Sequence, residues 1–219
     1  MKIHIIYDNE VYKKNIGLKS DWGFACMIDT GDETILFDTG AKGDILLNNI
    51  NILGLDLSSV DKIVLSHEHW DHTGGLKALL PSLDTVELYR LGSQQLKKKI
   101  HVIDSEKSQE IAQGVYTTGR LSGLVDEQSL VLQGKKGCFV LVGCSHPGVE
   151  KILMVARQYG DIKGLIGGFH GFDNFNVLED VDFICPCHCT AHKKELKKVF
   201  PEKISNCGVG KLIDINVVP

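Results

Sequence analysis

Residues 64–76 have the sequence VLSHEHWDHTGGL, in which four side chains able to bind a metal ion fall within six positions. These side chains are His67, His69, Asp71 and His72. An apolar run precedes the stretch and a helix-like run follows it, a pattern typical of a strand, a loop and a helix. Imidazole and carboxylate ligands together suit zinc, iron or manganese. The stretch therefore predicts a metal site on a loop that follows a buried strand.

An extended backbone would turn His67, His69 and Asp71 to one side of this loop, because alternate side chains of a strand share a face. His72 would reach the same pocket from the bend before the helix. The alternative is a polar loop with solvated histidines. It is disfavoured because histidine is uncommon, and three of them with an aspartate at this spacing rarely arise by chance.

Length and composition are ordinary for a soluble globular protein. Hydrophobic residues make up 43% and charged residues 24% of the 219 positions. A net charge of −4 gives no reason to expect nucleic acid or a membrane as a partner. No apolar run approaches the ~18–20 residues of a membrane span. Seven cysteines, an odd number, do not suggest a disulfide scaffold, so a cytoplasmic location is expected.

Strand and helix patterns alternate along the whole chain. Strands are predicted at residues 1–8, 24–29, 33–37, 86–91, 100–103, 129–132, 138–142, 162–166 and 181–184. The second and third of these form a hairpin pattern. Helices are predicted at 41–53, from 149 onward and in the lysine-rich run after 190. No low-complexity linker interrupts the pattern, so we expect one domain, 1–219, with two similar halves that meet near residue 121.

Three further histidines follow strands of the second half: His146, His170 and His188. Taken alone, each would more often be a turn or packing residue. In layered α/β proteins, however, ligands gather at loops along one edge of the sheets. We therefore expect His146 and His188 to join the first cluster as metal ligands, and His170 either to line the site or to be structural.

These residues resemble the metallo-β-lactamase superfamily, whose H-x-H-x-D-H signature fits HEHWDH at residues 67–72. Residues 35–40, 143–148, 167–170 and 188–190 are similar to one branch, the dihydropterin-ribofuranosyl-aminobenzene-phosphate synthase-like proteins. That branch is associated with a proposed step in methanopterin synthesis. Histidine, not glutamate, at position 69 differs from the flavodiiron oxygen reductases and favours a hydrolase-type site.

The resemblance implies an αββα sandwich with a site for two divalent ions at one edge of the two sheets. Zinc is the expected metal, with manganese and iron as alternatives. Six side chains would hold the ions: His67, His69 and His146 the first, and Asp71, His72 and His188 the second. Asp38, which follows a hairpin strand, would support a ligand histidine instead of only capping a turn. Asp71 and His170 would be catalytic, with His170 donating to the substrate or the leaving group.

Cys144 stands where the superfamily usually has a bridging carboxylate. Its thiolate could bind a soft metal, or the side chain could pack in the core, as buried free cysteine commonly does. We expect core packing, so that the second ion binds more weakly and Cys144→Ser has little effect. Cys185, Cys187 and Cys189 alternate and do not match the C-x₂-C pairs of structural metal sites, so reduced thiols are expected.

The expected function is hydrolysis of a small-molecule phosphate ester or phosphodiester by metal-activated hydroxide. Thioesters, lactones and β-lactams fit the same motif, because a fold does not select among substrates. Two other classes stay open: a synthase or transferase acting on a pterin precursor, and a non-catalytic metal-dependent sensor. The sequence does not predict the oligomeric state.

Overall fold

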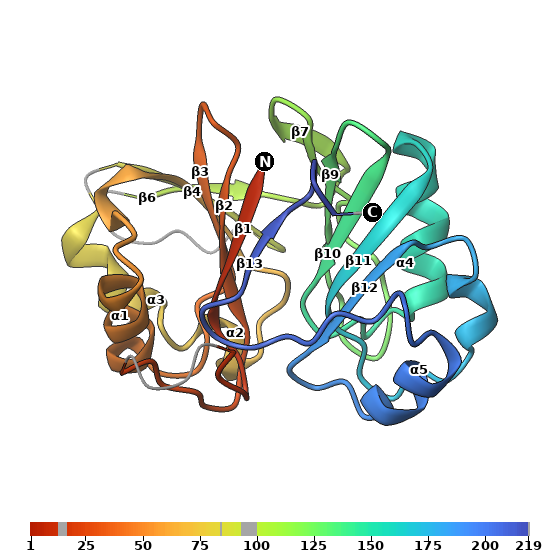
Figure 1. Cartoon of the computed structure of the whole chain (residues 1–219). Coiled ribbons are helices and arrows are strands. Elements are labelled where there is room, and N and C mark those ends of the chain that lie inside the picture. Colours follow the sequence, from red (N-terminus) through yellow and green to blue (C-terminus); the bar gives the residue numbers. More distant parts are fainter. Residues whose placement is uncertain (13–16, 84, 93–99, 219) are drawn as a thin grey trace.

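Two β-sheets face each other and helices cover their outer faces, which is the αββα sandwich expected from the sequence (Figure 1). The computed structural model describes residues 1–12, 17–83, 85–92 and 100–218. α1 (Gly43–Ile52) and α3 (Leu76–Leu79) lie outside the first sheet, and α4 (Val149–Ala156) and α5 (Lys193–Val199) lie outside the second. Within the described residues, no helix is long and apolar enough to cross a membrane.

The first sheet has the strand order β13-β1-β2-β3-β4-β5-β6 in the described part of the chain. The bounds are β1 Lys2–Tyr7, β2 Ala25–Asp29, β3 Thr34–Phe37, β4 Val60–Val64, β5 Val86–Arg90, β6 Ile100–Asp104 and β13 Leu212–Asp214. β2 and β3 pair antiparallel with Met27 opposite Leu36, which confirms the predicted hairpin. β3 to β6 run parallel, so their carboxyl ends meet at one edge.

The second sheet has the order β12-β11-β10-β9-β8-β7. The bounds are β7 Gln109–Ala112, β8 Val115–Thr117, β9 Leu130–Gln133, β10 Cys138–Val142, β11 Ile162–Gly168 and β12 Phe183–Cys187. β10, β11 and β12 are parallel. The short strands β7, β8 and β13 were not predicted, and the chain changes sheets between β6 and β7. The boundary near residue 121 between two similar halves stays a prediction.

Short 3₁₀ turns complete the connections: η1 Leu57–Ser59, η2 Leu80–Ser82, η3 Arg157–Tyr159 and η4 Phe175–Leu178.

The layer between the sheets is apolar on both sides. Phe37 and Ile5 from the first sheet pack in one cluster with Leu141 and Ile166 from the second, all fully buried. Burying such a side chain stabilises the fold by ~1.5–3 kcal/mol. The opposite faces of both sheets pack against the outer helices. Burial on both faces explains near-continuous apolar runs such as Cys138–Val142. The packed layers thus fix the strand ends, from which the histidine loops start.

Backbone strain is concentrated at one edge of this sandwich. Among the described residues, the non-glycine positions with positive φ are Asp38 (58°), Ser145 (62°), His170 (46°) and His188 (41°). Each follows the carboxyl end of a parallel strand, respectively β3, β10, β11 and β12. Such conformations cost ~1–3 kcal/mol each and persist where the surroundings hold them. The shared edge is therefore a candidate functional region.

Candidate metal centre

The loop after β4 becomes helical earlier than the sequence predicted. Trp70–Thr73 form α2, and the amides of His72 and Thr73 both donate to the carbonyl of His69. His67 stays beside the strand end, whereas Asp71 and His72 project from a helical turn. The expectation that His67, His69 and Asp71 share one face is wrong, because the helical rotation carries Asp71 to the side of His188.

One buried carboxylate, that of Asp38, orients two histidines. Its Oδ2 lies 2.7 Å from His72 Nδ1 and accepts from Ser66 Oγ at 2.8 Å, while Oδ1 accepts from the Ser66 amide at 2.7 Å. Ser66 Oγ is in turn 2.9 Å from His67 Nδ1. This network assigns the proton of each ring to Nδ1 and leaves a lone pair on each Nε2. This is the arrangement expected of a carboxylate that holds metal-binding histidines in position.

Glu127 orients His146 in the same way, although sequence reasoning missed it. Its Oε2 lies 3.0 Å from both the amide nitrogen and Nδ1 of His146. Its Oε1 accepts from the amides of Gly143, Cys144 and Ser145 at 2.9–3.0 Å. Burial opposes the charge, but His146 and the amides lower the pKa of Glu127 to about 2. The loop after β10 is therefore folded around a buried, ionised carboxylate.

Asp8 and Asn9, which directly follow β1, orient His188. Asn9 Oδ1 lies 3.0 Å from His188 Nδ1, Asn9 Nδ2 donates to the His188 carbonyl at 3.1 Å, and Asp8 Oδ1 accepts from the His188 amide at 2.7 Å. Burial lowers the pKa of His188, which favours a neutral ring, and the contact of Nδ1 with Asn9 Oδ1 assigns the ring proton to Nδ1. That nitrogen lies 3.2 Å from Asp71 Oδ2. Two atoms that both carry lone pairs face each other, a contact that a cation would stabilise.

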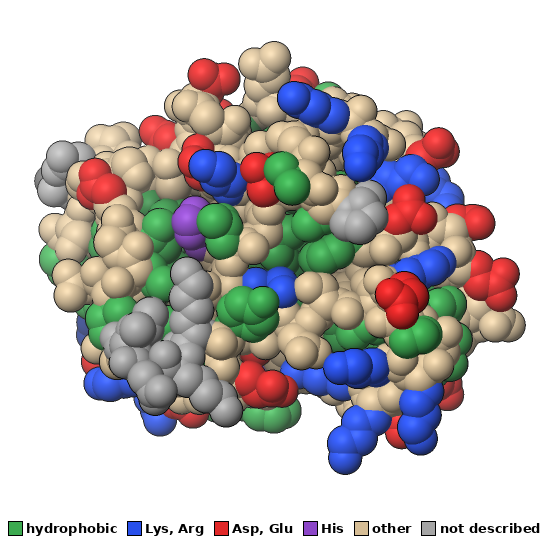
Figure 2. Space-filling view, in the orientation of Figure 1, with side chains coloured by type: hydrophobic (Ala, Val, Ile, Leu, Met, Phe, Trp, Pro, Cys, Tyr) green, Lys and Arg blue, Asp and Glu red, His purple; other side chains and the backbone are tan. Residues whose placement is uncertain are grey.

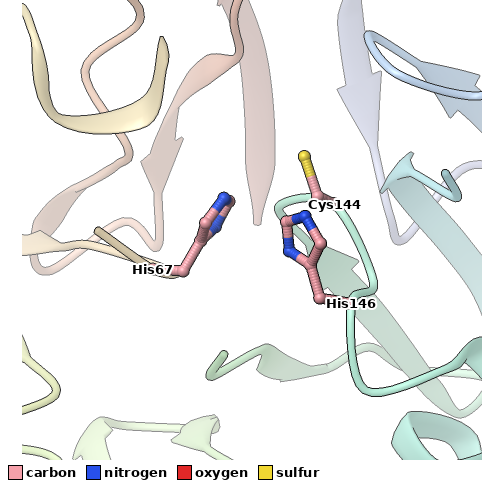
Figure 3. Close-up of side chains that lie close together, drawn as sticks. All are labelled: His67, Cys144 and His146. Carbon is pink, nitrogen blue, oxygen red and sulfur yellow. The ribbon is translucent and has the colours of Figure 1, made fainter. Parts of the chain in front are cut away.

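Cys144 lies between two groups of potential ligand atoms. Its Sγ forms one group with His67 and His146 (Figure 3) and another with His72 and His188, and the atoms of each group lie within 4.8 Å of one another. Sγ is 3.2 Å from His72 Nε2. Cys144 is buried, but the expectation that it faces the core is wrong, because the loop that wraps Glu127 turns the sulfur toward the histidines. A hydrogen bond with Cys189 and burial raise the pKa of the Cys144 thiol.

The set of donor atoms fits divalent metal ions. Burial lowers the pKa of His67 to about 3 and that of His72 to about 4, so both rings are neutral at pH 7. The Nε2 atoms of His67 and His188 are buried and have no hydrogen-bond partner among the described residues. Buried polar atoms are nearly always paired. Bound metal would explain why these two nitrogens, which lie in the two groups that share Cys144, are left unpaired.

His69 and His170 lie at the rim of the cleft and are both exposed. The ring centroid of His69 is 4.6 Å from that of His67 and 4.9 Å from that of His146. The centroid of His170 is 5.3 Å from that of His146. His146 and His170 both line a pocket of about 320 Å³ next to the cleft. The structure thus brings all six proposed ligands together, with Asp38 behind them and His170 beside them.

A family model of the metallo-beta-lactamase superfamily matches residues 23–153. This span contains Asp38, the histidine loop after β4, Glu127 and the loop of Cys144 and His146. The chain belongs to the metallo-β-lactamase superfamily. Members of this superfamily generally bind divalent metal ions, which agrees with the two groups of candidate ligands in the cleft.

Individual relatives extend over most of the chain. An uncharacterized protein of Methanocaldococcus jannaschii, MJ0448, is 28% identical over 260 residues, covering 97% of this chain and 100% of that protein. A 7,8-dihydropterin-6-methyl-4-(beta-D-ribofuranosyl)-aminobenzene-5'-phosphate synthase of the same organism is 25% identical, covering 82% of this chain and 83% of that enzyme. The crystal structure of Tm1679, a metal-dependent hydrolase of the beta-lactamase superfamily, has a TM-score of 0.77 and 25% identity, covering 99% of both chains.

Sequence reasoning missed three supporting residues: Ser66, Glu127 and Asn9. Ser66 stands directly before His67 and Asn9 directly after a predicted strand, so both occupied positions where a supporting side chain could have been sought. Glu127 lies 19 positions before His146, in a loop without a recognisable pattern. Only the fold shows what it contacts.

Proposed function

We propose that this chain is a metal-dependent hydrolase that uses two divalent ions to cleave a phosphate ester or phosphodiester. The observation that carries the proposal is the pair of unpartnered, buried Nε2 atoms of His67 and His188, in the two groups that share Cys144. His67, His69 and His146 would hold one ion, and Asp71, His72 and His188 the other. Ions bound there would supply Lewis acidity and lower the pKa of water toward ~7.

The chain's own residues prepare the ligands and move protons. Asp38, Glu127 and Asn9 hold the Nδ1 side of the rings, so that each Nε2 is directed into the cleft. Burial would raise the pKa of Asp71, but the neighbouring rings of His188 and His72 lower it below its usual range. Asp71 is therefore ionised, which suits a metal ligand, and it could accept a proton only from water that bound metal has made more acidic.

The pocket beside His146 and His170 combines a helix amino terminus with two acidic side chains, Glu150 and Asp173. The first turn of α4 lines it through Gly148, Val149 and Glu150, and no side chain caps that turn. Helix amino termini attract anions. Glu150 itself accepts a hydrogen bond from Asn174 at 3.1 Å. The helix amino terminus supports a phosphate ester, and His170 would be able to donate to a leaving group bound in this pocket.

An assay of metal-reconstituted protein against phosphomonoesters, phosphodiesters, lactones and thioesters tests the proposal. We expect turnover of a phosphate ester. His170→Ala should lower turnover by ~100-fold or more, the usual contribution of a general acid, while metal content is unchanged. His101→Ala, on the exposed side of β6, is the control. Turnover confined to lactones or thioesters would exclude the phosphate assignment.

A synthase acting on a pterin precursor is the second candidate, favoured by the similarity to the Methanocaldococcus jannaschii synthase. Product analysis with a phosphoribosyl-type substrate and a pterin precursor separates the two candidates. A hydrolase transfers only to water, whereas a synthase yields a product that joins both substrates. Metal and ligand binding without turnover of any compound would instead indicate a sensor.

A further inference from the structure

Three cysteines from different parts of the chain meet beside the metal centre, in the layer between the sheets. Cys185 and Cys187 alternate on β12, so their side chains share a face. Cys207 comes from the segment before β13. The three Sγ atoms lie within 4.8 Å of one another, and all three residues are buried. The sequence-based objection to a metal site here considered only the β12 spacing and missed Cys207 as the third thiol.

A buried carboxylate borders these thiols. Asp8 is fully buried, and its Oδ1 accepts from the His188 amide at 2.7 Å. Its Oδ2 has no hydrogen-bond partner among the described residues. Asp8 interacts electrostatically with Cys185 and Cys207, although its oxygens lie outside the group formed by the three sulfur atoms. An unpaired buried oxygen is rare and costly. A cation bound by the thiols would also lower the electrostatic cost of this buried oxygen.

We propose that Cys185, Cys187 and Cys207 bind a third metal ion, a structural zinc or another thiophilic cation. Structural zinc sites are four-coordinate and rich in thiolates, so one further ligand, such as a water molecule from the neighbouring pocket, would complete this one. Soft thiolate ligands also distinguish this site from the histidine-rich metal centre. No donor in the proposed set is shared with that centre.

The surroundings balance the charge of such a site. Three thiolates, one carboxylate and a divalent cation together carry two negative charges, and buried charge requires compensation. Lys211 is buried, interacts electrostatically with Cys185 and donates to Ser205 Oγ at 2.8 Å. Lys193 interacts with Asp8 and Cys187 in the same way. Lys211 supplies one positive charge, and Lys193 contributes in part because it also pairs with Glu10.

An opening leads from the surface to the thiols. Cys207 and Pro186 line a pocket of about 410 Å³, together with Glu10 and Lys193, which form an ion pair at 3.2 Å. Lys and Arg side chains gather over the neighbouring α5 (Figure 2). An ion held here would connect the ends of β1 and β12 to the segment before β13. Because Cys187 directly precedes His188, the ion would position the loop that carries His188.

Cobalt(II) bound to thiolates has a charge-transfer absorption. This absorption can distinguish the proposed third ion from the ions of the histidine-rich metal centre. Cys144→Ser removes the thiol of that centre, so charge-transfer absorption that remains on adding cobalt(II) to the apo variant comes from another thiol site. We expect such absorption, saturating at one cobalt ion per chain. Adding Cys207→Ala should abolish it. Adding Cys138→Ala should not, because the thiol of Cys138 faces the carbonyl of Tyr159 at 3.4 Å.

The unmodified protein provides a second measurement if the cysteine variants fail to fold. Cys207 lines the pocket, and bound zinc should protect its thiol from alkylation. Mass spectrometry of the peptide that contains Cys207 measures the extent of alkylation. Equal alkylation with and without zinc overturns the proposal. Cobalt absorption that persists after Cys207→Ala, or that is absent from the Cys144→Ser protein, also overturns it. Neither readout requires hydrolysis, so failure of the hydrolase proposal leaves this test intact.

Discussion

The two sheets bring histidines to one cleft but hold them by different means. On the first sheet, His67 and His72 come from a single loop, and Asp38 orients His72 directly and His67 through Ser66. On the second sheet, His146 and His188 come from separate loops with separate supports, a carboxylate for one and an amide for the other. Burial raises the pKa of Asp38 to about 7, whereas that of Glu127 is lowered to about 2. Because Asp38 supports both His67 and His72, replacing it should affect both ions. Replacing Glu127 or Asn9, which each support one histidine, should affect mainly one ion.

Each group of ligands also combines the two sheets. His67 is grouped with His146, and His72 with His188, so each ion would connect loops from opposite sides of the cleft. Cys144 belongs to both groups. The comparison can therefore be tested by removing ligands, then the shared thiol, then the supports.

Removing a ligand histidine should have the largest effect. His67→Ala and His188→Ala each remove one Nε2 donor from one group. Hydrolysis should fall by more than ~100-fold, because residues that only orient ligands already contribute ~10–100-fold. Bound metal should fall by about one ion per chain, measured by elemental analysis. The histidines lie on loops, so circular dichroism should be unchanged. An active, metal-replete His188→Ala protein would contradict the assignment.

Replacing the shared thiol should weaken both ions. Cys144→Ser puts a poorer ligand for soft metals in both groups, and we expect each affinity to fall at least ~10-fold. The effect should depend on pH. The raised pKa keeps the thiol protonated near neutral pH, and metal binding expels that proton. Loss of the Cys144 proton should therefore make the metal affinity of the wild type rise by ~10-fold per pH unit. The Cys144→Ser variant should lack this contribution to the pH dependence. Calorimetric titration at several pH values measures both, and unchanged affinities would restore the core-packing interpretation.

The fold and the first-sheet loop could be predicted because their signals are local. A hairpin, a buried strand and a run of metal ligands each occupy a few consecutive positions. The onset of α2 could not, because histidines spaced for a strand also fit a helical turn. Glu127 and Asn9 act on histidines 19 and 179 positions away, and no local pattern encodes such contacts. Cys144 was misjudged for a related reason: burial alone does not show which way a side chain points.

Altering the supports tests the comparison directly. Asp38→Asn removes the carboxylate that orients His72 and, through Ser66, His67. Both affinities should fall, each by ~10–100-fold. Glu127→Gln can keep an oxygen for the three loop amides and loses only the contact with His146, so the loss should be confined to the ion held by His67 and His146. Calorimetric titration resolves the two ions. A loss confined to one ion in Asp38→Asn would show that Ser66 does not transmit the effect of the carboxylate.

The smallest effect is expected from Asn9→Ala. Asn9 is a neutral amide, so it fixes the tautomer of His188 without adding charge behind the ring, and Asp8 still holds the His188 backbone. We expect only the ion held by Asp71, His72 and His188 to weaken, by ~10-fold, the low end of the range for supporting residues. Asn48→Ala removes a comparable amide that bonds the Gly17 carbonyl at 3.1 Å, and it should leave both affinities unchanged. Equal weakening of both ions in Asn9→Ala would mean that the second-sheet supports act together, as Asp38 does alone, and that the two sheets do not differ in the way proposed.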